Sequence, residues 1–444
     1  MTWLNRYRLK LYLENSIWIL PVLAALMAIV VVRIIDRFER YEGWRSLIRP
    51  ETAQTVLATM TASLFTFIVF VASVLLIAMQ LASAQLSPRI IGFIFRDRVT
   101  RYSLTLFVFC FSFSIAALAR IGDTVPSITT RVAAYSGVVS LAAFLYLIDH
   151  VGRKLRPSGA LSVVGAAGRS VIEHVYPRLL DGSAAPSSSS LQPASEAEAA
   201  AAAPDDARAD VAAARVIVCD RDGVVLAFDF AGLAAFAQRS NCVVELVPRV
   251  GEFVASGEPL FRLHYGTGSG TGGDADAATD DVLRRSVALG QERTLEQDPA
   301  FAFRIIVDVA SKALSPAIND PTTAVLAIDQ IHRLLRDIGR RYLDDDRVCD
   351  ASGAVRLIYR TPGWDDFVHL AITEIRLFGG GSIQVARRLR AMLDNLIQVL
   401  PPARTEVLKQ ELGLLNRFTT RLFAEPEDRA LATCADLQGV GARH

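Results

Sequence analysis

The chain has 444 residues, a formal net charge of +1, 52% apolar residues and 21% charged residues. A net charge this close to zero provides no global field that would favour nucleic acid or a strongly acidic partner. The apolar excess lies before residue 150, and most of the charged residues follow it. This asymmetry predicts a membrane part followed by a large soluble region.

The residues that usually carry chemistry are scattered. The five cysteines form no C-x-x-C pair, and the six histidines form no H-E-x-x-H pattern. The sequence also contains no P-loop, no dinucleotide fingerprint and no nucleophile–base pair. It therefore predicts no cofactor, no metal site and no enzyme. Cysteines without disulfide spacing suit a reducing cytoplasm.

Four uncharged segments near the N-terminus are long enough to cross a bilayer, which needs about 20 apolar residues. The predicted spans are 15–33, 53–85, 102–120 and 131–149. The apolar core of the first is too long for a signal peptide, and no clear cleavage site follows it. As a helix, the second would exceed the hydrocarbon core, so it must tilt or extend beyond it.

Lysine and arginine in the short loops predict the orientation. With the N-terminus inside, the cytoplasmic side collects ten of these residues and the outside collects seven. Four spans return the chain to its starting side. We therefore expect a multi-pass protein of the bacterial inner membrane, with the N-terminus and the C-terminal region in the cytoplasm and the lipid bilayer as a partner.

A polar stripe marks the second span. Its members recur every seven residues: Thr52, Thr59, Thr66, Ser73, Gln80 and Ser87. A repeat of seven keeps these side chains on one face of a helix. The opposite face is expected to contact lipid and includes Leu57, Leu64, Phe67, Ile68, Val71, Leu75 and Ile77.

Two interpretations of this stripe remain open. Small and hydroxyl residues let membrane helices pack closely, and the third span offers a matching face at Ser103, Cys110, Ser114 and Ala117. Alternatively, copies of the helix line a water-filled path in a homo-oligomer, because pores are lined by polar groups and closed by apolar constrictions. The stripe has no charged member that would identify an ion or small polar ligand.

The predicted domains are a transmembrane domain (1–152), a juxtamembrane helix (153–182), a linker (183–214), a small β-module (215–265), a flexible loop (266–281) and a helical cytoplasmic domain (282–440). The linker is rich in Ala, Ser, Pro and acidic residues, which cannot bury a core. The fold class is therefore an α-helical membrane part followed by a cytoplasmic α+β region.

Within the β-module, residues 251–261 read G-E-F-V-x-x-G-E-P-L-F. This run resembles one half of a biotinyl/lipoyl-type barrel-sandwich, with Gly251 and Gly257 at its tight turns. The attachment lysine of that family is missing. The resemblance therefore implies a structural β-module that carries neither biotin nor lipoate.

Two Asp-Pro pairs mark helix starts in the last domain. Asp298-Pro299 and Asp320-Pro321 each place an acidic N-cap before a first-turn proline, which predicts helices over 300–314 and 322–341. Further helices are expected at 365–377, 382–399, 403–423 and 427–437. The triple glycine 379–381 follows a helix and is read as a hinge or C-cap.

The run S-P-x-I-N-D-P-T-T-A at 315–324 is the most specific motif of the chain. Together with Gln80, Ser87-Pro88-Arg89 and Asp97, it resembles a widespread family of predicted bacterial membrane proteins classified as a domain of unknown function. The resemblance extends from the first span to about residue 420. It implies four N-terminal spans and a cytoplasmic β-plus-helical region, and it supplies no activity.

The N-D-P-T-T run also permits two interpretations. As structure, Asn319 and Asp320 cap one helix while Ser315-Pro316 ends the previous one. As function, Asn319, Asp320 and Thr322 would hold a cation or polar ligand at the helix N-terminus, and the three residues Asp298, Arg304 and Asp308 would share that site if the two helices are antiparallel. The candidate set is Asp298, Arg304, Asp308, Asn319, Asp320 and Thr322.

Two functions from different classes follow. The first is an oligomeric channel or transport-like protein whose cytoplasmic region assembles or gates the conduit. The second is a membrane-anchored sensor or scaffold without a conduit. Oligomeric state separates them, because a conduit built from one polar stripe requires several copies around an axis.

Overall fold

The computed structural model describes residues 2–42, 49–85, 89, 97–122, 125–154, 156–180, 215–265, 277–343 and 346–440. Ser87, the linker 183–214 and most of the loop 266–281 lie outside these residues. The chain forms two compact units. One comprises Lys10–Ala160, and the other joins Met1–Leu9 to Leu161–His444.

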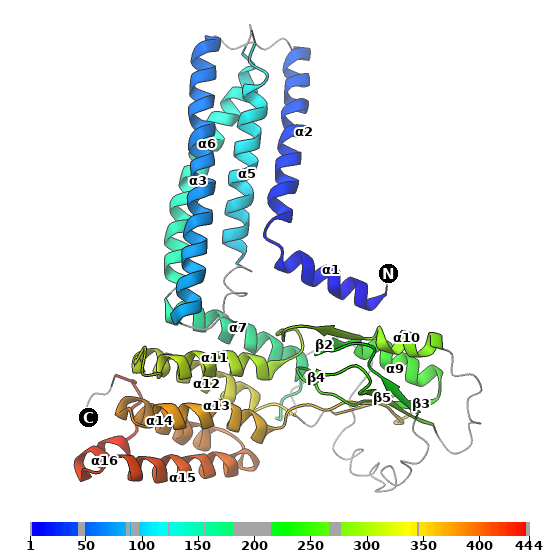
Figure 1. The fold of residues 1–444 in the computed structure, drawn as a ribbon, viewed down its shortest axis with the longest axis vertical. Coiled ribbons are helices and arrows are strands. Elements are labelled where there is room, and N and C mark those ends of the chain that lie inside the picture. Colours follow the sequence, from blue (N-terminus) through cyan, green and yellow to red (C-terminus); the bar gives the residue numbers. More distant parts are fainter. Residues whose placement is uncertain are drawn as a thin grey trace. The chain divides into compact units, whose positions relative to one another are not determined.

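The first unit contains four helices that are long and apolar enough to cross a membrane. They are α2 (Ile19–Glu42), α3 (Pro50–Gln85), α5 (Arg98–Leu118) and α6 (Ser127–Lys154), which confirms the four predicted spans (Figure 1). With 36 residues, α3 is about 54 Å long at 1.5 Å per residue. It therefore exceeds a hydrocarbon core of about 30 Å.

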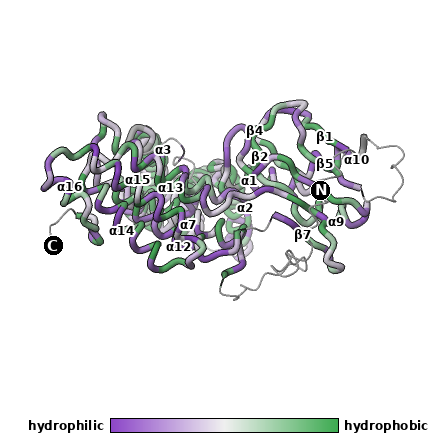
Figure 2. The backbone as a smooth tube through the Cα atoms, turned by 90° about the horizontal axis from the view of Figure 1, so that it is seen from below, coloured by the Kyte–Doolittle hydropathy of each residue, from purple (hydrophilic) through white to green (hydrophobic). Residues whose placement is uncertain are grey.

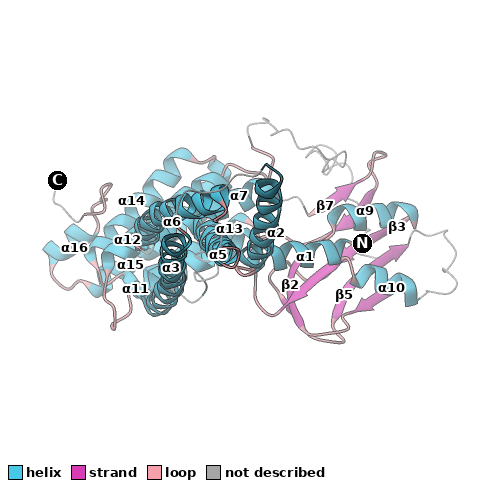
Figure 3. Ribbon diagram, turned by 90° about the horizontal axis from the view of Figure 1, so that it is seen from above, coloured by secondary structure: helices cyan, strands magenta, loops and turns pink. Residues whose placement is uncertain are grey.

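Helix α5 is the centre of this bundle, since it packs against α2, α3 and α6 (Figure 3). Phe113 and Ala117 of α5 pack with Leu57 of α3 in one buried cluster. Phe107 of α5 packs with Val71 of α3 in a second. The third span therefore contacts the apolar side of α3, not its polar stripe.

This packing corrects one expectation about lipid contact. Leu57, Leu64, Val71 and Leu75 are at most 9% exposed, so this side of α3 faces the bundle of its own chain. Phe67 and Ile68 are half-buried, and only Ile77 of the expected lipid face is exposed. The reason is that α5 offers large apolar side chains that the hydroxyl stripe could not match.

The second unit contains two β-sheets. The first has the order β1 (Arg215–Val218), β5 (Pro259–Tyr265), β3 (Cys242–Leu246), β8 (Val355–Ile358) and β7 (Arg347–Cys349). Its neighbours are antiparallel except β3 and β8, which are parallel. The second sheet has the order β4 (Phe253–Val254), β2 (Gly223–Phe228) and β6 (Val287–Gly290).

Three of these strands differ from expectation. β6, β7 and β8 lie in the segment 282–440 that was expected to be helical, and they extend the β-module well beyond residue 265. Leu357 of β8 pairs with Val244 of β3, and both are fully buried. Such short strands give little periodic signal, and their pairing is decided by distant residues. Gly251 and Gly257 both have φ +89°, which confirms the expected turns.

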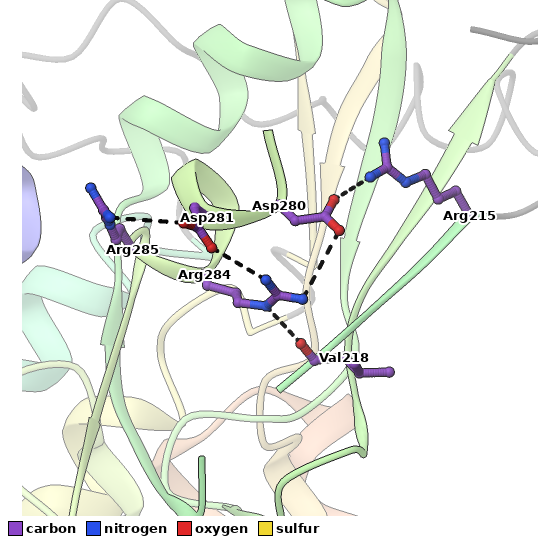
Figure 4. A network of polar contacts seen from close by, with 6 residues as sticks. All are labelled: Arg215, Val218, Asp280, Asp281, Arg284 and Arg285. Atoms are coloured by element: carbon purple, nitrogen blue, oxygen red, sulfur yellow. Dashed lines mark hydrogen bonds and ion pairs between the residues drawn. The ribbon is translucent and has the colours of Figure 1, made fainter. Parts of the chain in front are cut away.

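Two short helices flank the strands. α9 (Phe230–Arg239) packs Leu233 and Ala237 into the β-module core. α10 (Ala277–Arg284) occupies part of the expected flexible loop and is held to β1 by the network in Figure 4. There Asp280 pairs with Arg215, and Arg284 Nε donates to the Val218 carbonyl at 3.0 Å. Arg284 of this helix thus satisfies a backbone carbonyl of β1, which is an edge strand of its sheet.

The N-terminal end of α1 (Trp3–Asn15) belongs to this second unit. Leu4 is 7% exposed and packs with Leu226 of β2 and Ala288 of β6. Trp3 and Tyr7 border the same cluster. The β-module therefore holds the segment that leads into the first span.

The helices of the C-terminal region are those predicted, with ends that agree within five residues; the largest difference is at the last helix, which ends at Ala432 and not at 437. They are α11 (Pro299–Ala313), α12 (Pro321–Ile338), α13 (Trp364–Gly379), α14 (Ile383–Val399), α15 (Thr405–Leu422) and α16 (Pro426–Ala432), preceded by α7 (Pro157–Val175). Asp298 and Asp320 accept from the backbone N–H groups of Phe301 and Thr323, so both are N-caps as predicted. Hydrophilic and hydrophobic residues mix along these helices, as in amphipathic helices that bury one side (Figure 2).

Candidate functional site

The polar stripe of α3 is exposed within the chain. Thr52, Thr59, Thr66, Ser73 and Gln80 all lie on the side of the helix away from Leu57, Leu64 and Val71. At 100° per residue, the stripe and the buried residues point to opposite sides of the helix. The stripe therefore faces the surroundings of the protomer: lipid, water or another copy.

Hydrogen bonds within α3 satisfy the hydroxyl donors. Thr59 Oγ1 donates to the Thr55 carbonyl at 2.8 Å, Thr66 Oγ1 to the Ala62 carbonyl at 3.0 Å and Ser73 Oγ to the Val69 carbonyl at 2.9 Å. Each hydroxyl oxygen keeps acceptor capacity. The exposed face thus presents a line of acceptors, while the cost of placing an unpaired donor beside lipid is avoided.

Large apolar residues interrupt this side of α3 toward its C-terminal half. Phe70 is 48% exposed and Ile77 is 64% exposed, and each follows a stripe member by four residues. Residues four apart are neighbours on a helix surface. The same side therefore changes from hydroxyl-rich around Thr59 to mixed around Ser73.

Polar clusters fix both ends of the bundle. Glu39 of α2 is 3% exposed and accepts from the first turn of α6, namely the Ile128 N–H and Thr129 Oγ1, the latter at 2.6 Å. Glu39 therefore caps α6 although it precedes Ile128 by 89 residues. No local sequence signal indicates this cap, because Glu39 does not precede the helix it serves.

At the opposite end, Asp97 joins α5 to α6. It caps α5 by accepting from the Thr100 N–H at 3.2 Å, and it also binds His150 Nε2 at 2.8 Å and Lys154 Nζ. Its side chain is 8% exposed. Asp97 was noted only through the family resemblance, and its two partners on α6 were not predicted.

The candidate residues of the C-terminal region do not form one site. Asp298 begins α11 and Asp320 begins α12, so α11 separates them by about 22 Å at its helical rise. Asp298 is 3% exposed and pairs with Arg293 at 2.6 Å. Asp320 accepts from Thr323 Oγ1 at 2.6 Å. Each carboxylate therefore serves its own helix start.

Arg304 and Asp308 come together one turn apart on α11. Arg304 binds Asp308 and also forms two hydrogen bonds to Glu374 of α13, at 2.5 and 2.7 Å. Hydrogen bonding to Arg304 lowers the pKa of Glu374, and hydrogen bonding to Glu374 raises the pKa of Arg304. Glu374 was not predicted, since its helix lies far along the chain. This trio joins α11 to α13.

The two remaining candidates, Asn319 and Thr322, lie in the turn before α12 and on its first turn. Asn319 has φ +48° in the turn between α11 and α12, a conformation in which asparagine is favoured. Thr322 is exposed on the first turn of α12. Burial raises the pKa of Asp298, although Arg293 opposes this shift. In the part of the chain that the structure describes, no three His, Cys, Asp or Glu side chains are placed to hold a metal ion.

Four apolar helices, capped at both ends by buried carboxylates and followed by a mixed α/β region and C-terminal helices, define a four-span membrane protein with a large soluble region. The family model described as "Predicted membrane protein (DUF2254)" matches residues 14–395, and the chain belongs to this family. This confirms the resemblance found at the 315–324 motif.

Relatives of this chain occur in mycobacteria. An uncharacterized protein of Mycobacterium tuberculosis (strain CDC 1551 / Oshkosh) is 26% identical over 447 residues, which cover 96% of this chain and 81% of the relative. An uncharacterized protein of Mycobacterium bovis gives the same identity and coverage. No solved structure matches the chain.

Proposed function

We propose that the protein is an oligomeric channel or transport-like protein of the bacterial inner membrane. In this proposal, copies of α3 turn their polar stripes toward a shared conduit, and the cytoplasmic region assembles or gates it. One observation carries the proposal: Thr59, Thr66 and Ser73 lie on the exposed side of α3, not in its own bundle. Association of copies would remove these polar side chains from lipid.

The exposed apolar residues suggest how such a conduit would close. Phe70 and Ile77 share the stripe side of α3, where several copies would bring their side chains together around an axis. Apolar constrictions gate by excluding water. The hydroxyl-rich half would stay hydrated, and the half around Phe70 would be the barrier.

The orientation proposal places the N-terminus and the soluble region in the cytoplasm. Leu4 packs on Leu226 and Ala288, which supports placing the N-terminus and the soluble region on the same side of the membrane. An even number of spans also requires that the N-terminus and the soluble region lie on the same side. The excess of lysine and arginine in the loops assigned to the inside then favours the cytoplasm.

The test is conductance of the purified full chain in planar bilayers. We expect polar-solute or ion currents from the wild type, loss of current in Thr66→Leu and Ser73→Leu, and larger current in Phe70→Ser. Ala72→Leu is the matched control, because Ala72 is exposed on α3 but lies off the stripe. Absent currents, or equal currents in Ser73→Leu and Ala72→Leu, would contradict the conduit.

A sensor or scaffold without a conduit is the second candidate. It is favoured by the internal bonds of the stripe, since Thr59 and Thr66 already satisfy their donors on backbone carbonyls and tolerate lipid. The spans would then only anchor the soluble unit. A monomer at all detergent concentrations in light scattering, together with absent currents, would support this candidate.

A further inference from the structure

A groove runs between the juxtamembrane helix α7 and helix α12 of the C-terminal region. We call it the α7–α12 groove and define it by Gly165, Arg169, Glu173, Gln330 and Arg333. Ser162 and Ser170 add hydroxyl groups to its wall. All of these residues belong to the second compact unit.

Two glycines let α7 pack closely against its neighbours, Gly168 against α11 and Gly165 against α12. A Cβ at Gly168 would lie 2.7 Å from the Ala302 side chain, and one at Gly165 would lie 2.5 Å from Gln330 Oε1. A larger residue at Gly168 would clash with the fixed Cβ of Ala302, whereas one at Gly165 would displace the end of the Gln330 side chain. Helix α7 therefore lies close to both α11 and α12, and the Gln330 amide lies at Gly165 instead of being covered by an α7 side chain.

Two arginines from different helices face this groove without acidic partners. Both Arg169 and Arg333 are exposed, and among the described residues neither forms an ion pair or a hydrogen bond. Other arginines of the same unit are paired, such as Arg388 with Asp329 at 2.6 Å. Glu173 lines the groove as well, which leaves one net positive charge.

This set of groups suits a phosphate. Guanidinium groups bind phosphate through paired N–H donors, and neighbouring hydroxyl and amide groups can donate to the remaining oxygens. The Glu173 carboxylate leaves the lining groups with one net positive charge, which suits a singly charged phosphate better than a doubly charged one. The groove is open to solvent, so the phosphate can remain attached to a larger molecule.

The position of the groove along the chain favours a lipid as the source. Ser162 follows Lys154, the last residue of the fourth span, by only eight residues. Eight residues extend at most about 28 Å, so the covalent chain keeps this end of α7 near the membrane surface. Anionic phospholipids concentrate phosphate there.

We propose that the α7–α12 groove binds an anionic phosphate group, supplied by the headgroup of an anionic phospholipid. Arg169 and Arg333 hold the phosphate from two sides, and Ser170 and Gln330 donate hydrogen bonds to it. Binding would tie α7 to α12 at the point where the soluble region leaves the fourth span. This site is independent of any conduit formed by α3.

The test is native mass spectrometry of the full chain in detergent, titrated in separate arms with phosphatidylglycerol, phosphatidylcholine and inorganic phosphate. The critical variant is R169Q/R333Q. The matched control is R239Q/R336Q, which removes two exposed arginines of the same unit that lie outside the groove. Since all four side chains are exposed, none of these changes removes a buried contact.

We expect one phosphatidylglycerol site to weaken about tenfold for each groove arginine removed and to be unchanged in the control. If R169Q/R333Q and R239Q/R336Q bind alike, or phosphatidylcholine binds as tightly as phosphatidylglycerol, the proposal is wrong. Inorganic phosphate that binds without lipid and displaces phosphatidylglycerol would overturn the lipid source. Should the double variant be unstable, the single variants R169Q and R333Q test the same expected loss of phosphatidylglycerol affinity.

Discussion

Gly251 and Gly257 provide a matched pair that tests how the β-module is joined to the helical layer. Both have φ +89°, so alanine at either position adopts an unfavourable backbone at a cost of about 1–2 kcal/mol. Their surroundings differ. Nothing lies within 4 Å of a Cβ built at Gly257, whereas a Cβ at Gly251 would lie 2.3 Å from Arg293 Nη2 and 2.6 Å from Asp298 Oδ2.

Gly251→Ala must therefore disturb the pair between Arg293 and the buried Asp298. Separating a buried ion pair costs about 3–5 kcal/mol. Arg293 is 35% exposed and can shift toward solvent, so we take about half of that cost. The predicted loss of stability is then about 3–4 kcal/mol for Gly251→Ala and about 1–2 kcal/mol for Gly257→Ala.

Hydrogen exchange of the full chain, followed by mass spectrometry, measures this difference locally. In Gly251→Ala we expect faster exchange both in the turn before β4 and at the start of α11, where Asp298 caps the helix. In Gly257→Ala only the turn between β4 and β5 should change. Equal effects of the two variants at α11 would refute the role assigned to Gly251.

Two further predictions concern the C-terminal helices. Burial lowers the pKa of His332, so as the pH falls the unfolded chain binds a proton at this imidazole before the folded chain does. We therefore expect the stability of α12 to fall as the pH drops below about 6.5. In hydrogen exchange measured against pH, His332→Gln should flatten this dependence. Arg304→Met removes both hydrogen bonds to Glu374 and should destabilise the contact between α11 and α13 by about 1–3 kcal/mol in urea unfolding. Arg285→Met breaks only an exposed pair, so a loss as large as that of Arg304→Met would contradict this reasoning.

Part of this protein could be predicted from local patterns alone. Uncharged length located the four spans, because a helix must satisfy its own backbone in lipid. Asp298-Pro299 and Asp320-Pro321 located two helix starts, since an N-cap acts within three residues. The turns at Gly251 and Gly257, where φ is positive, were instead expected from the resemblance of residues 251–261 to half of a barrel-sandwich.

Contacts between distant residues could not be predicted in this way. β8 pairs with β3 across more than a hundred residues, and its four residues carry no periodicity strong enough to identify a strand. Glu39 caps α6 and Glu374 binds Arg304 only because the fold brings their helices together. Short strands and long-range ion pairs depend on partners that a single segment does not contain.

The polar stripe on α3 shows most clearly which features depend on the sequence alone and which depend on the tertiary structure. Its seven-residue spacing was determined by the sequence, which placed Thr59, Thr66 and Ser73 on one side of a helix. Which side faces outward was decided by tertiary structure, because α5 presents Phe107 and Phe113 to the apolar side of α3. Close van der Waals contact between these α5 side chains and the apolar side of α3 favours this packing in lipid, and the hydroxyl side was therefore left exposed.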